Sequence, residues 1–122
     1  MSTRTHKSML KSGKVSIWVG NIRSEDELLA YVDDGGFGSD FDFQVKPELG
    51  RELRAESKCV PLQQLVHGFS SWSSFVAPCV TRGEELYISA ANCMVVLYAM
   101  EYIPSPKNNP NSPLAFLGVF DF

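Results

Sequence analysis

The 122-residue sequence lacks the motifs by which most small enzymes and metal proteins are recognised. It has two histidines and three cysteines, Cys59, Cys79 and Cys93, with no Cys-x-x-Cys pair. An odd number of widely spaced cysteines argues against a disulfide framework and a zinc site, so we interpret them as buried thiols in a reducing compartment. The glycine-rich stretch 35–38 has neither GxGxxG nor Walker spacing, and acidic residues flank it, which disfavours phosphate binding. We expect no cofactor and no metal ion.

Long apolar runs are absent as well. No segment has the length that crossing a bilayer requires, and residues 1–13 contain no apolar core of a signal peptide. We therefore expect a cytoplasmic protein without membrane contact. Residues 1–13 are polar, basic and without periodicity, which predicts a flexible tail. Residues 14–122 are predicted to form a single domain, since a chain of this length can bury roughly two thirds of its unfolded surface.

Basic residues are scarce beyond this tail. The chain has 11 Lys and Arg against 14 Asp and Glu, and four of the basic residues precede Val15: Arg4, Lys7, Lys11 and Lys14. The chain from Val15 onward therefore carries seven basic and fourteen acidic residues, a net charge of −7. Such a surface repels the phosphates of nucleic acids and attracts a basic protein.

What is present is the pattern of an α+β domain. Period-two alternation and apolar runs predict strands at 15–19, 39–45, 94–103 and 114–122. We expect the last strand to pair with the 94–103 strand. On the 39–45 strand, Phe41, Phe43 and Val45 would face inward.

Helical spacing predicts three helices, at 24–33, at 60–66 and from about 73 to 86, with a short helical turn at Pro47. Ser24 and Glu27 have capping-box spacing at the start of the first helix. Segments 34–38 and 104–113 are predicted loops. The resulting order is β-α-β-(α)-α-α-β-β, a small mixed or antiparallel sheet with helices mainly on one face.

Few side chains are candidates for chemistry. Asp40 and Asp42 would share one face of their strand and, with Asp121, offer oxygen ligands to a metal ion, although alternation alone predicts a solvated face there. His67 precedes Gly68 at a predicted helix end, where a cation complements the helix dipole. A small metal-dependent hydrolase or transferase using Asp40, Asp42 and His67 is therefore an alternative. We identify no catalytic residue.

Several segments occur in an order that resembles a known family. These are Val15-Ser-Ile-Trp-Val-Gly-Asn21, the acidic helix start at 24–31, Asp40-Phe-Asp-Phe43, Ala91-Asn92 before an apolar strand, and Phe116-Leu-Gly-Val-Phe120. Over residues 14–122 the chain resembles immunity protein family 22 of bacterial polymorphic toxin systems, formerly a family of unknown function. The resemblance implies a small non-enzymatic α+β domain that binds and neutralises a cognate toxin domain, often a nuclease.

The partner we predict is thus the C-terminal domain of a cognate toxin, and no nucleic acid. The contact surface would be acidic, with one aromatic anchor. We expect it to contain Glu25, Asp26, Glu27, Asp33, Asp34, Asp40 and Asp42, with Phe37 or Trp72 as the anchor. Trp72, in a serine-rich stretch, is expected to be partly exposed, and Trp18 to be buried. A structural module that self-associates through an exposed edge strand, such as the last one, is a further alternative.

Overall fold

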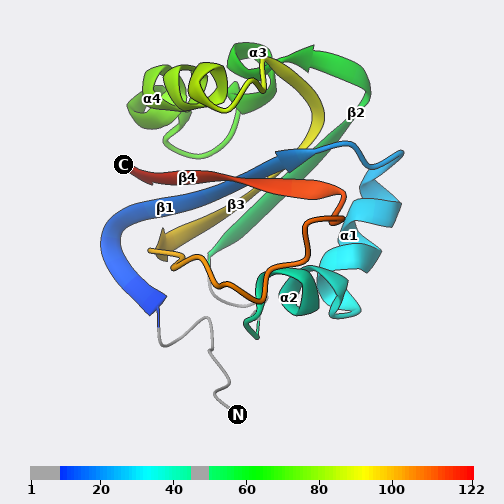
Figure 1. The fold of residues 1–122 in the computed structure, drawn as a ribbon. Coiled ribbons are helices and arrows are strands. Elements are labelled where there is room, and N and C mark those ends of the chain that lie inside the picture. The colour runs from blue at the N-terminus through cyan, green and yellow to red at the C-terminus, as the bar shows by residue number, and fades with distance from the viewer. Residues whose placement is uncertain (1–8, 45–49) are drawn as a thin grey trace.

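A four-stranded antiparallel sheet organises the chain, for which a computed structural model describes residues 9–44 and 50–122 (Figure 1). Its strands are β1 (Leu10–Gly20), β2 (Arg51–Pro61), β3 (Ala90–Met100) and β4 (Leu114–Asp121). Their order across the sheet is β2-β3-β1-β4, so β1 and β3 are central and β2 and β4 are the edges. The α+β class predicted from the sequence is confirmed.

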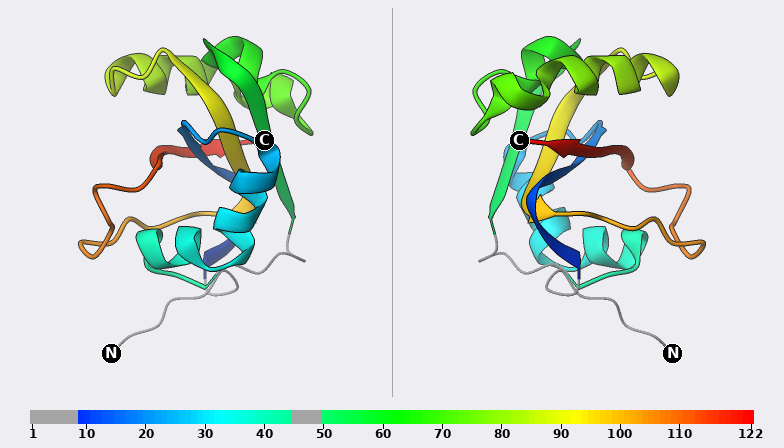
Figure 2. Two further views of the ribbon diagram at one scale, coloured as in Figure 1. Left: turned by 90° about the vertical axis from the view of Figure 1, so that its right-hand side faces the viewer. Right: turned by 90° about the vertical axis from the view of Figure 1, so that its left-hand side faces the viewer.

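Helices cover both faces of this sheet, not mainly one face as expected from the sequence (Figures 1 and 2). On one face lie α1 (Glu25–Asp33) and α2 (Gly36–Phe41), and on the other lie α3 (Leu62–Val66) and α4 (Trp72–Glu85). The reason is visible in β1, where Ile17 and Val19 point to one face and Trp18 to the other, all at most 1% exposed. Two large apolar faces require two covering layers.

The two layers enclose two separate cores. Beneath α3 and α4 the core is mostly aliphatic, with Val15, Ile17 and Val19 of β1 packed against residues such as Leu65 and Phe75. Beneath α1 and α2 it is built around the buried ring of Trp18. The rings that surround this tryptophan within 6.2 Å belong to Phe37, Phe41, Phe43, Tyr102 and Phe116. The predicted burial of Trp18 is confirmed.

The predicted strand at 39–45 is wrong. Gly36–Phe41 forms α2, bounded by Gly35 with φ +92° and Asp42 with φ +59°. Phe37 and Phe41 are four residues apart and therefore share one face of a helix. Phe41 and Phe43 do face inward, at 4% and 5% exposure, so the apolar spacing fits both a strand and a helix followed by a turn. Val45 and the turn predicted at Pro47 lie outside the described residues.

Two strands differ from expectation in place or partner. β1 begins at Leu10, so residues 10–13 belong to the sheet and not to the predicted tail. β4 pairs with β1, with Phe120 opposite Val15, and not with β3 as expected. β2 was not predicted at all, because residues 51–58 are dominated by charged side chains and show no apolar alternation.

The helix predictions are largely confirmed. Ser24 caps α1 by accepting a hydrogen bond from the Glu27 N–H at 3.2 Å. α3 starts directly after Pro61, α4 spans Trp72–Glu85, and the segment 101–113 contains no helix or strand. At the end of β1, a Cβ atom on Gly20 would lie 2.1 Å from the Pro113 carbonyl oxygen, so this segment closes tightly on β1. None of the helices in the described part of the chain is long and apolar enough to cross a membrane.

Candidate functional site

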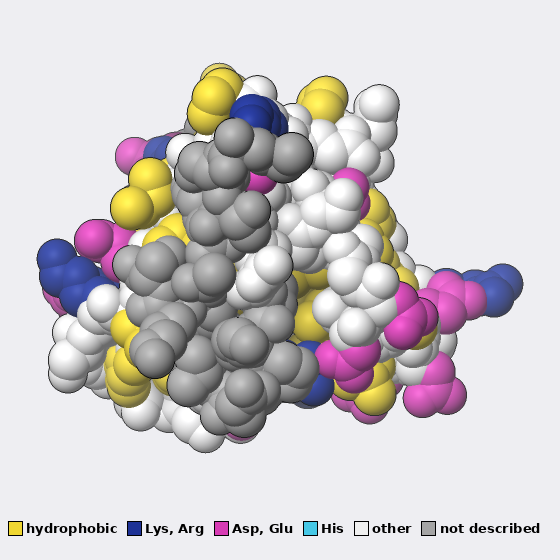
Figure 3. Space-filling view, turned by 90° about the horizontal axis from the view of Figure 1, so that it is seen from below, with side chains coloured by type: hydrophobic (Ala, Val, Ile, Leu, Met, Phe, Trp, Pro, Cys, Tyr) yellow, Lys and Arg dark blue, Asp and Glu magenta, His cyan; other side chains and the backbone are white. Residues whose placement is uncertain are grey.

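The outer face of α1 carries most of the acidic residues predicted to bind a partner. Glu25, Leu29 and Asp33 follow one another at four-residue spacing and therefore form one row along the helix. All three are exposed, Leu29 to 40%, and Asp26 and Asp34 lie beside them. We call these five residues the acidic α1 surface. Figure 3 shows acidic side chains gathered on the side of the molecule where α1 lies.

Three of its carboxylates have no cation beside them among the residues that the structure describes. Asp33 accepts a hydrogen bond from Arg51 Nη1 at 2.5 Å, and Glu27, on the neighbouring face, pairs with Arg23. Glu25, Asp26 and Asp34 form no ion pair with any residue in the ranges 9–44 and 50–122. Within the described residues, the negative charge of these three carboxylates is therefore uncompensated, and it lies on the same helix as the exposed Leu29.

Helix stability explains only one end of this charge distribution. Glu25, Asp26 and Glu27 occupy the first turn of α1, where carboxylates interact favourably with the positive end of the helix dipole. Asp33 and Asp34 lie at the opposite end, where a negative charge costs about 0.3–1 kcal/mol and no basic residue occupies the last turn. Arg51 offsets the charge of Asp33, whereas Asp34 has no such compensation.

Asp40 and Asp42 do not belong to this surface, contrary to the prediction. Asp40 accepts the Tyr31 hydroxyl at 2.6 Å and the side-chain amide of Asn109 at 2.9 Å. Asp42 accepts the hydroxyl of Ser105 at 2.7 Å. Both carboxylates are half-buried and attach the 101–113 segment to α2. Their role in the structure is therefore internal.

The pKa of Tyr31 reflects this attachment. Partial burial raises the pKa of its hydroxyl, and the hydrogen bond to Asp40 raises it further. Because the single Tyr31 proton is donated to Asp40, the Ser112 hydroxyl at 2.7 Å acts as the donor to Tyr31.

The predicted aromatic anchors also change. Phe37 is fully buried against Trp18, with ring centroids 4.9 Å apart, so it cannot contact a partner on the surface. Trp72 is half-buried as expected, and its ring lies 4.3 Å from that of His67, on the opposite side of the sheet from α1. Leu29 is instead the exposed apolar residue among the carboxylates. Its neighbour Leu28 is fully buried against the sheet.

The alternative metal site is not assembled. Asp40 and Asp42 lie in and after α2 on one side of the sheet, whereas His67 follows α3 on the other. Asp121, at the end of β4, pairs with Lys14 at 2.5 Å. In the described ranges no three His, Cys, Asp or Glu side chains are grouped so as to hold a metal ion.

The cysteines match the expectation in two of three cases. Burial raises the pKa of the Cys79 thiol to about 12 and that of Cys93 to about 11, which keeps both thiols protonated and unreactive. Cys59 is exposed, contrary to the prediction, and its thiol lies 3.0 Å from Asn21 Oδ1.

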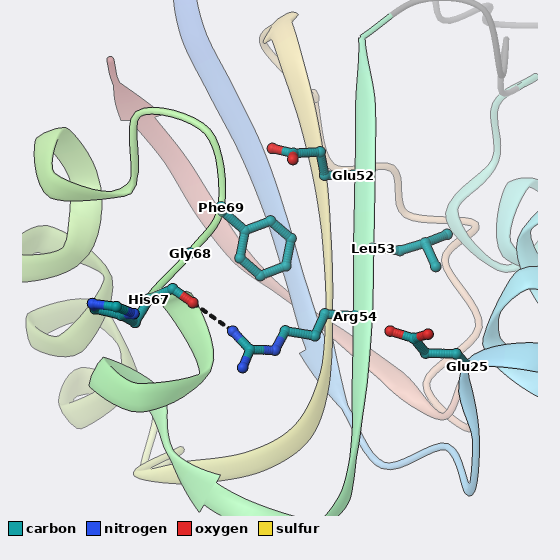
Figure 4. A pocket seen from close by; sticks show the side chains of 7 residues that line it. All are labelled: Glu25, Glu52, Leu53, Arg54, His67, Gly68 and Phe69. Atoms are coloured by element: carbon teal, nitrogen blue, oxygen red, sulfur yellow. Dashed lines mark hydrogen bonds between the residues drawn. The ribbon is translucent and has the colours of Figure 1, made fainter.

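A second surface feature is a groove of about 510 Å³ along the outer side of β2 (Figure 4). Glu25 of α1 lies on one side of the strand and the loop His67–Phe69 on the other. The side chains of Glu52 and Arg54 point towards this loop, and that of Leu53 points the opposite way. We call this feature the edge groove. Sequence reasoning missed it because it did not predict β2.

Hydrogen bonds hold the polar side chains of the edge groove. Arg54 donates to Glu56 at 2.6 Å and to the His67 carbonyl oxygen at 2.5 Å. Glu52 accepts the Tyr98 hydroxyl at 2.5 Å and the Ser70 N–H at 2.8 Å. Partial burial raises the pKa of Glu52, but these hydrogen bonds outweigh that effect, and the net pKa is lowered. Glu52 is therefore ionised at neutral pH.

The chain was compared with known proteins at three levels. No protein-family model, no curated protein and no solved structure matches it. The assignment to immunity protein family 22 therefore stays a prediction from the residues of the chain.

Proposed function

We propose that this protein is a non-enzymatic immunity protein that binds a cognate toxin domain and neutralises it, with the acidic α1 surface as the contact. The observation that carries the proposal is that Glu25, Asp26 and Asp34 form no ion pair within the described residues and lie on the same helix as the exposed Leu29. An apolar centre with a polar rim is the usual anatomy of a protein interface. The resemblance of residues 14–122 to the immunity family supports the same conclusion.

The charge of the surface indicates the chemistry of the partner. Enzymes that cleave nucleic acids bind phosphates with clusters of Lys and Arg, so their active-site clefts are basic. A net charge of −7 from Val15 onward raises the association rate with such a partner and disfavours acidic ones. In this proposal the carboxylates of α1 take the place of nucleic-acid phosphates, and the bulk of the domain blocks access to the cleft.

The position of α1 suits this role. The helix packs on the sheet through Leu28 and Val32, which are 0% and 3% exposed, while its opposite face is in solvent. At its N-terminal end, Asn92 of β3 accepts the Ile22 N–H at 2.9 Å and donates to the Ile22 carbonyl oxygen at 2.6 Å. The surface is therefore presented by an anchored helix, which lowers the entropy lost on binding.

Co-expression tests the function as a whole. The proposal predicts that a polymorphic toxin is encoded next to this protein's gene, and the probe is its C-terminal domain, produced in a bacterial host. We expect growth to stop with the toxin domain alone and to be restored when this chain is co-expressed. Unchanged killing, together with no complex between the purified proteins, would contradict the proposal.

A charge-neutral variant tests the surface. In the double variant Asp26→Asn/Asp34→Asn we expect toxin affinity to fall by about tenfold or more and its salt dependence to weaken, because two unpaired charges are lost. The matched control Glu84→Gln/Glu85→Gln removes two charges from exposed positions of α4, on the other side of the sheet, and should bind as the wild type does. Calorimetry at two salt concentrations measures both. Equal affinities for the two double variants would show that the toxin binds elsewhere.

A further inference from the structure

The outer side of β2 is an unpaired sheet edge. Tyr98 N–H donates to the Gly50 carbonyl oxygen at 2.8 Å, and in an antiparallel pair the bonded residues alternate. Glu52 and Arg54 therefore bond to β3, whereas the N–H and C=O groups of Arg51, Leu53 and Ala55 point away from the sheet. These outward groups have no hydrogen-bond partner in the described part of the chain. Figure 2 shows β2 at the margin of the sheet, and the edge groove lies along it.

The other sheet edge is less available. α4 packs against β4, and Arg82 Nε donates to the outward Leu117 carbonyl oxygen at 3.3 Å. The register between β1 and β4 also shifts between Ile17 and Trp18. A bulge and a bonded side chain are common devices that keep an edge strand from pairing. For the described ranges, β2 is thus the edge that another strand can extend.

The charges on β2 are arranged symmetrically with opposite signs. The regular part of the strand runs from Arg51 to Ala55, since its register with β3 shifts between Ala55 and Val60. Its centre is Leu53, with Glu52 on one side and Arg54 on the other. When two such strands run antiparallel about a twofold axis at Leu53, each Glu52 lies opposite an Arg54. A strand whose charges were alike at these two positions would repel its own copy.

We propose that a second copy of this chain occupies the edge, so that two β2 strands pair antiparallel about Leu53 and join two sheets into one. Leu53 pairs with Leu53 of the second copy, and Arg51 pairs with Ala55 in both directions, which uses all the outward backbone groups named above. Glu52 and Arg54 then face each other at positions without backbone hydrogen bonds, where opposing side chains lie closest. This inference goes beyond the proposed function and does not depend on it.

Existing contacts leave room for the cross-strand ion pairs. Glu52 accepts the Tyr98 hydroxyl and the Ser70 N–H through Oε1, and the Ser70 side chain also bonds to this carboxylate. Arg54 uses Nε and Nη1 for Glu56, Leu65 and His67, which leaves Nη2. A contact of one strand per copy is small, so the dimer is expected to be weak.

Sedimentation equilibrium of the full chain is the first test. We expect the average mass to rise from monomer towards dimer between about 10 µM and about 1 mM, the range in which small interfaces associate. A monomer at every concentration would overturn the proposal, whether or not the edge accepts an extended peptide from another protein.

Charge reversal tests the register. Glu52→Lys places Lys opposite Arg54, and Arg54→Glu places Glu opposite Glu52, so each variant alone should dimerise at least about tenfold more weakly. An equimolar mixture of the two variants restores opposite charges at both positions and should form a mixed dimer. A folding defect in either chain is not repaired by mixing. Glu84→Lys makes the same charge change on α4 and should leave dimerisation unchanged.

Amide hydrogen exchange of the wild type gives a test that needs no variant. Protection of the Leu53 and Ala55 N–H groups should rise with protein concentration, because they become bonded only in the dimer. The Glu52 and Arg54 N–H groups bond to β3 and should be protected at all concentrations, which makes them an internal control. If the mass rises while the exchange of Leu53 and Ala55 stays constant, the copies associate through another surface and the proposal is wrong.

Discussion

Each face of the sheet has a hydrogen bond between a tyrosine hydroxyl and a carboxylate, but the two bonds join different elements of the fold. On each face a tyrosine hydroxyl donates to a carboxylate: Tyr31 to Asp40 at 2.6 Å, and Tyr98 to Glu52 at 2.5 Å. Tyr98 and Glu52 both belong to the sheet, and Tyr98 lies 2.7 Å from the Ser70 carbonyl oxygen, so the loop before α4 attaches directly to the strands. Tyr31 lies on α1, and its partners lie in α2 and in the 101–113 segment.

The difference follows from how much each layer can bury. α4 is a helix of 14 residues and packs over an aliphatic core, whereas α2 has six residues and contributes mainly two phenylalanines. A helix as short as α2 is not stable by itself and depends on its tertiary contacts. The α1–α2 face therefore relies on interlocking rings around Trp18 and on polar attachment to a long segment. Each of the following predictions tests this contrast.

The largest expected effect is the loss of the central ring on the α1–α2 face. Trp18→Ala should lower the free energy of unfolding by about 5 kcal/mol, and Phe75→Ala, on the α3–α4 face, by about 3 kcal/mol. Both side chains are fully buried. Among the residues that the structure describes, however, Trp18 contacts five rings and Phe75 pairs with Tyr98 alone. Urea denaturation measures both. Equal losses of unfolding free energy would show that the contacts between aromatic rings add no stability beyond that of burial.

A smaller effect is expected from the two tyrosine hydroxyls. Tyr31→Phe and Tyr98→Phe should each lower the free energy of unfolding by about 1 kcal/mol, the usual net value of such a hydrogen bond. Hydrogen exchange should separate them. Tyr31→Phe should speed exchange at the Asn109 N–H, which bonds to the Asp40 carbonyl oxygen, and Tyr98→Phe at the Ser70 N–H. Changes spread over both faces in both variants would contradict two independent attachments.

The hydroxyls of Tyr31 and Tyr98 also make the free energy of unfolding depend on pH. Burial and a neighbouring carboxylate raise the pKa of both hydroxyls in the folded state above the ordinary value of 10.0. The folded state therefore holds these protons more tightly than the unfolded state does. Their contribution to stability is complete below pH 10 and is lost as the pH rises further through the folded-state pKa. The stability of each Phe variant should fall less steeply above pH 10 than that of the wild type, as urea denaturation across that range would show.

The smallest expected effect has the opposite sign. Asp34→Asn removes an unpaired negative charge from the C-terminal end of α1, so the free energy of unfolding should rise by about 0.5 kcal/mol. Asp26→Asn removes a charge of the same sign from the first turn of the same helix, where the dipole favours it, and should lower the free energy of unfolding by a similar amount. Under the proposed function, the stabilised Asp34 variant binds the toxin domain more weakly. A variant that is both destabilised and fully active would remove the argument for this residue.

Local signals in the sequence were enough for much of the fold. The Ser24 cap and the helical spacing after it placed α1 within one residue. The apolar run at 94–103 identified the central strand β3, which spans Ala90–Met100. The acidic residues of α1 were also recognised as a surface, because carboxylates at these helical positions remain in solvent. In these cases the residues near in sequence decide the structure.

The predictions from the sequence fail where contacts between residues distant in the chain determine the local structure. Phe41 and Phe43 fit a strand, but Asp42 adopts φ +59° and Tyr102 packs against both rings, which only the folded chain reveals. β2 is an edge strand whose charged side chains bond to loops far along the chain, so it shows no apolar alternation. Phe37, predicted as a surface anchor, is buried, and Leu29 is exposed, because contacts with distant residues decide which side chain is covered. Strand pairing likewise depends on contacts between distant segments.

The central position of β1 has a consequence for the time at which the fold can form. Its neighbours in the sheet, β3 and β4, begin at Ala90 and Leu114, so β1 has no strand partner while the first half of the chain is being synthesised. Until then Ile17 and Trp18, on its two faces, lack the cores that bury them. Pairing over such separations makes folding slow and exposes a nascent chain to aggregation and chaperones. Of these three strands, β1 is thus made first and completed last.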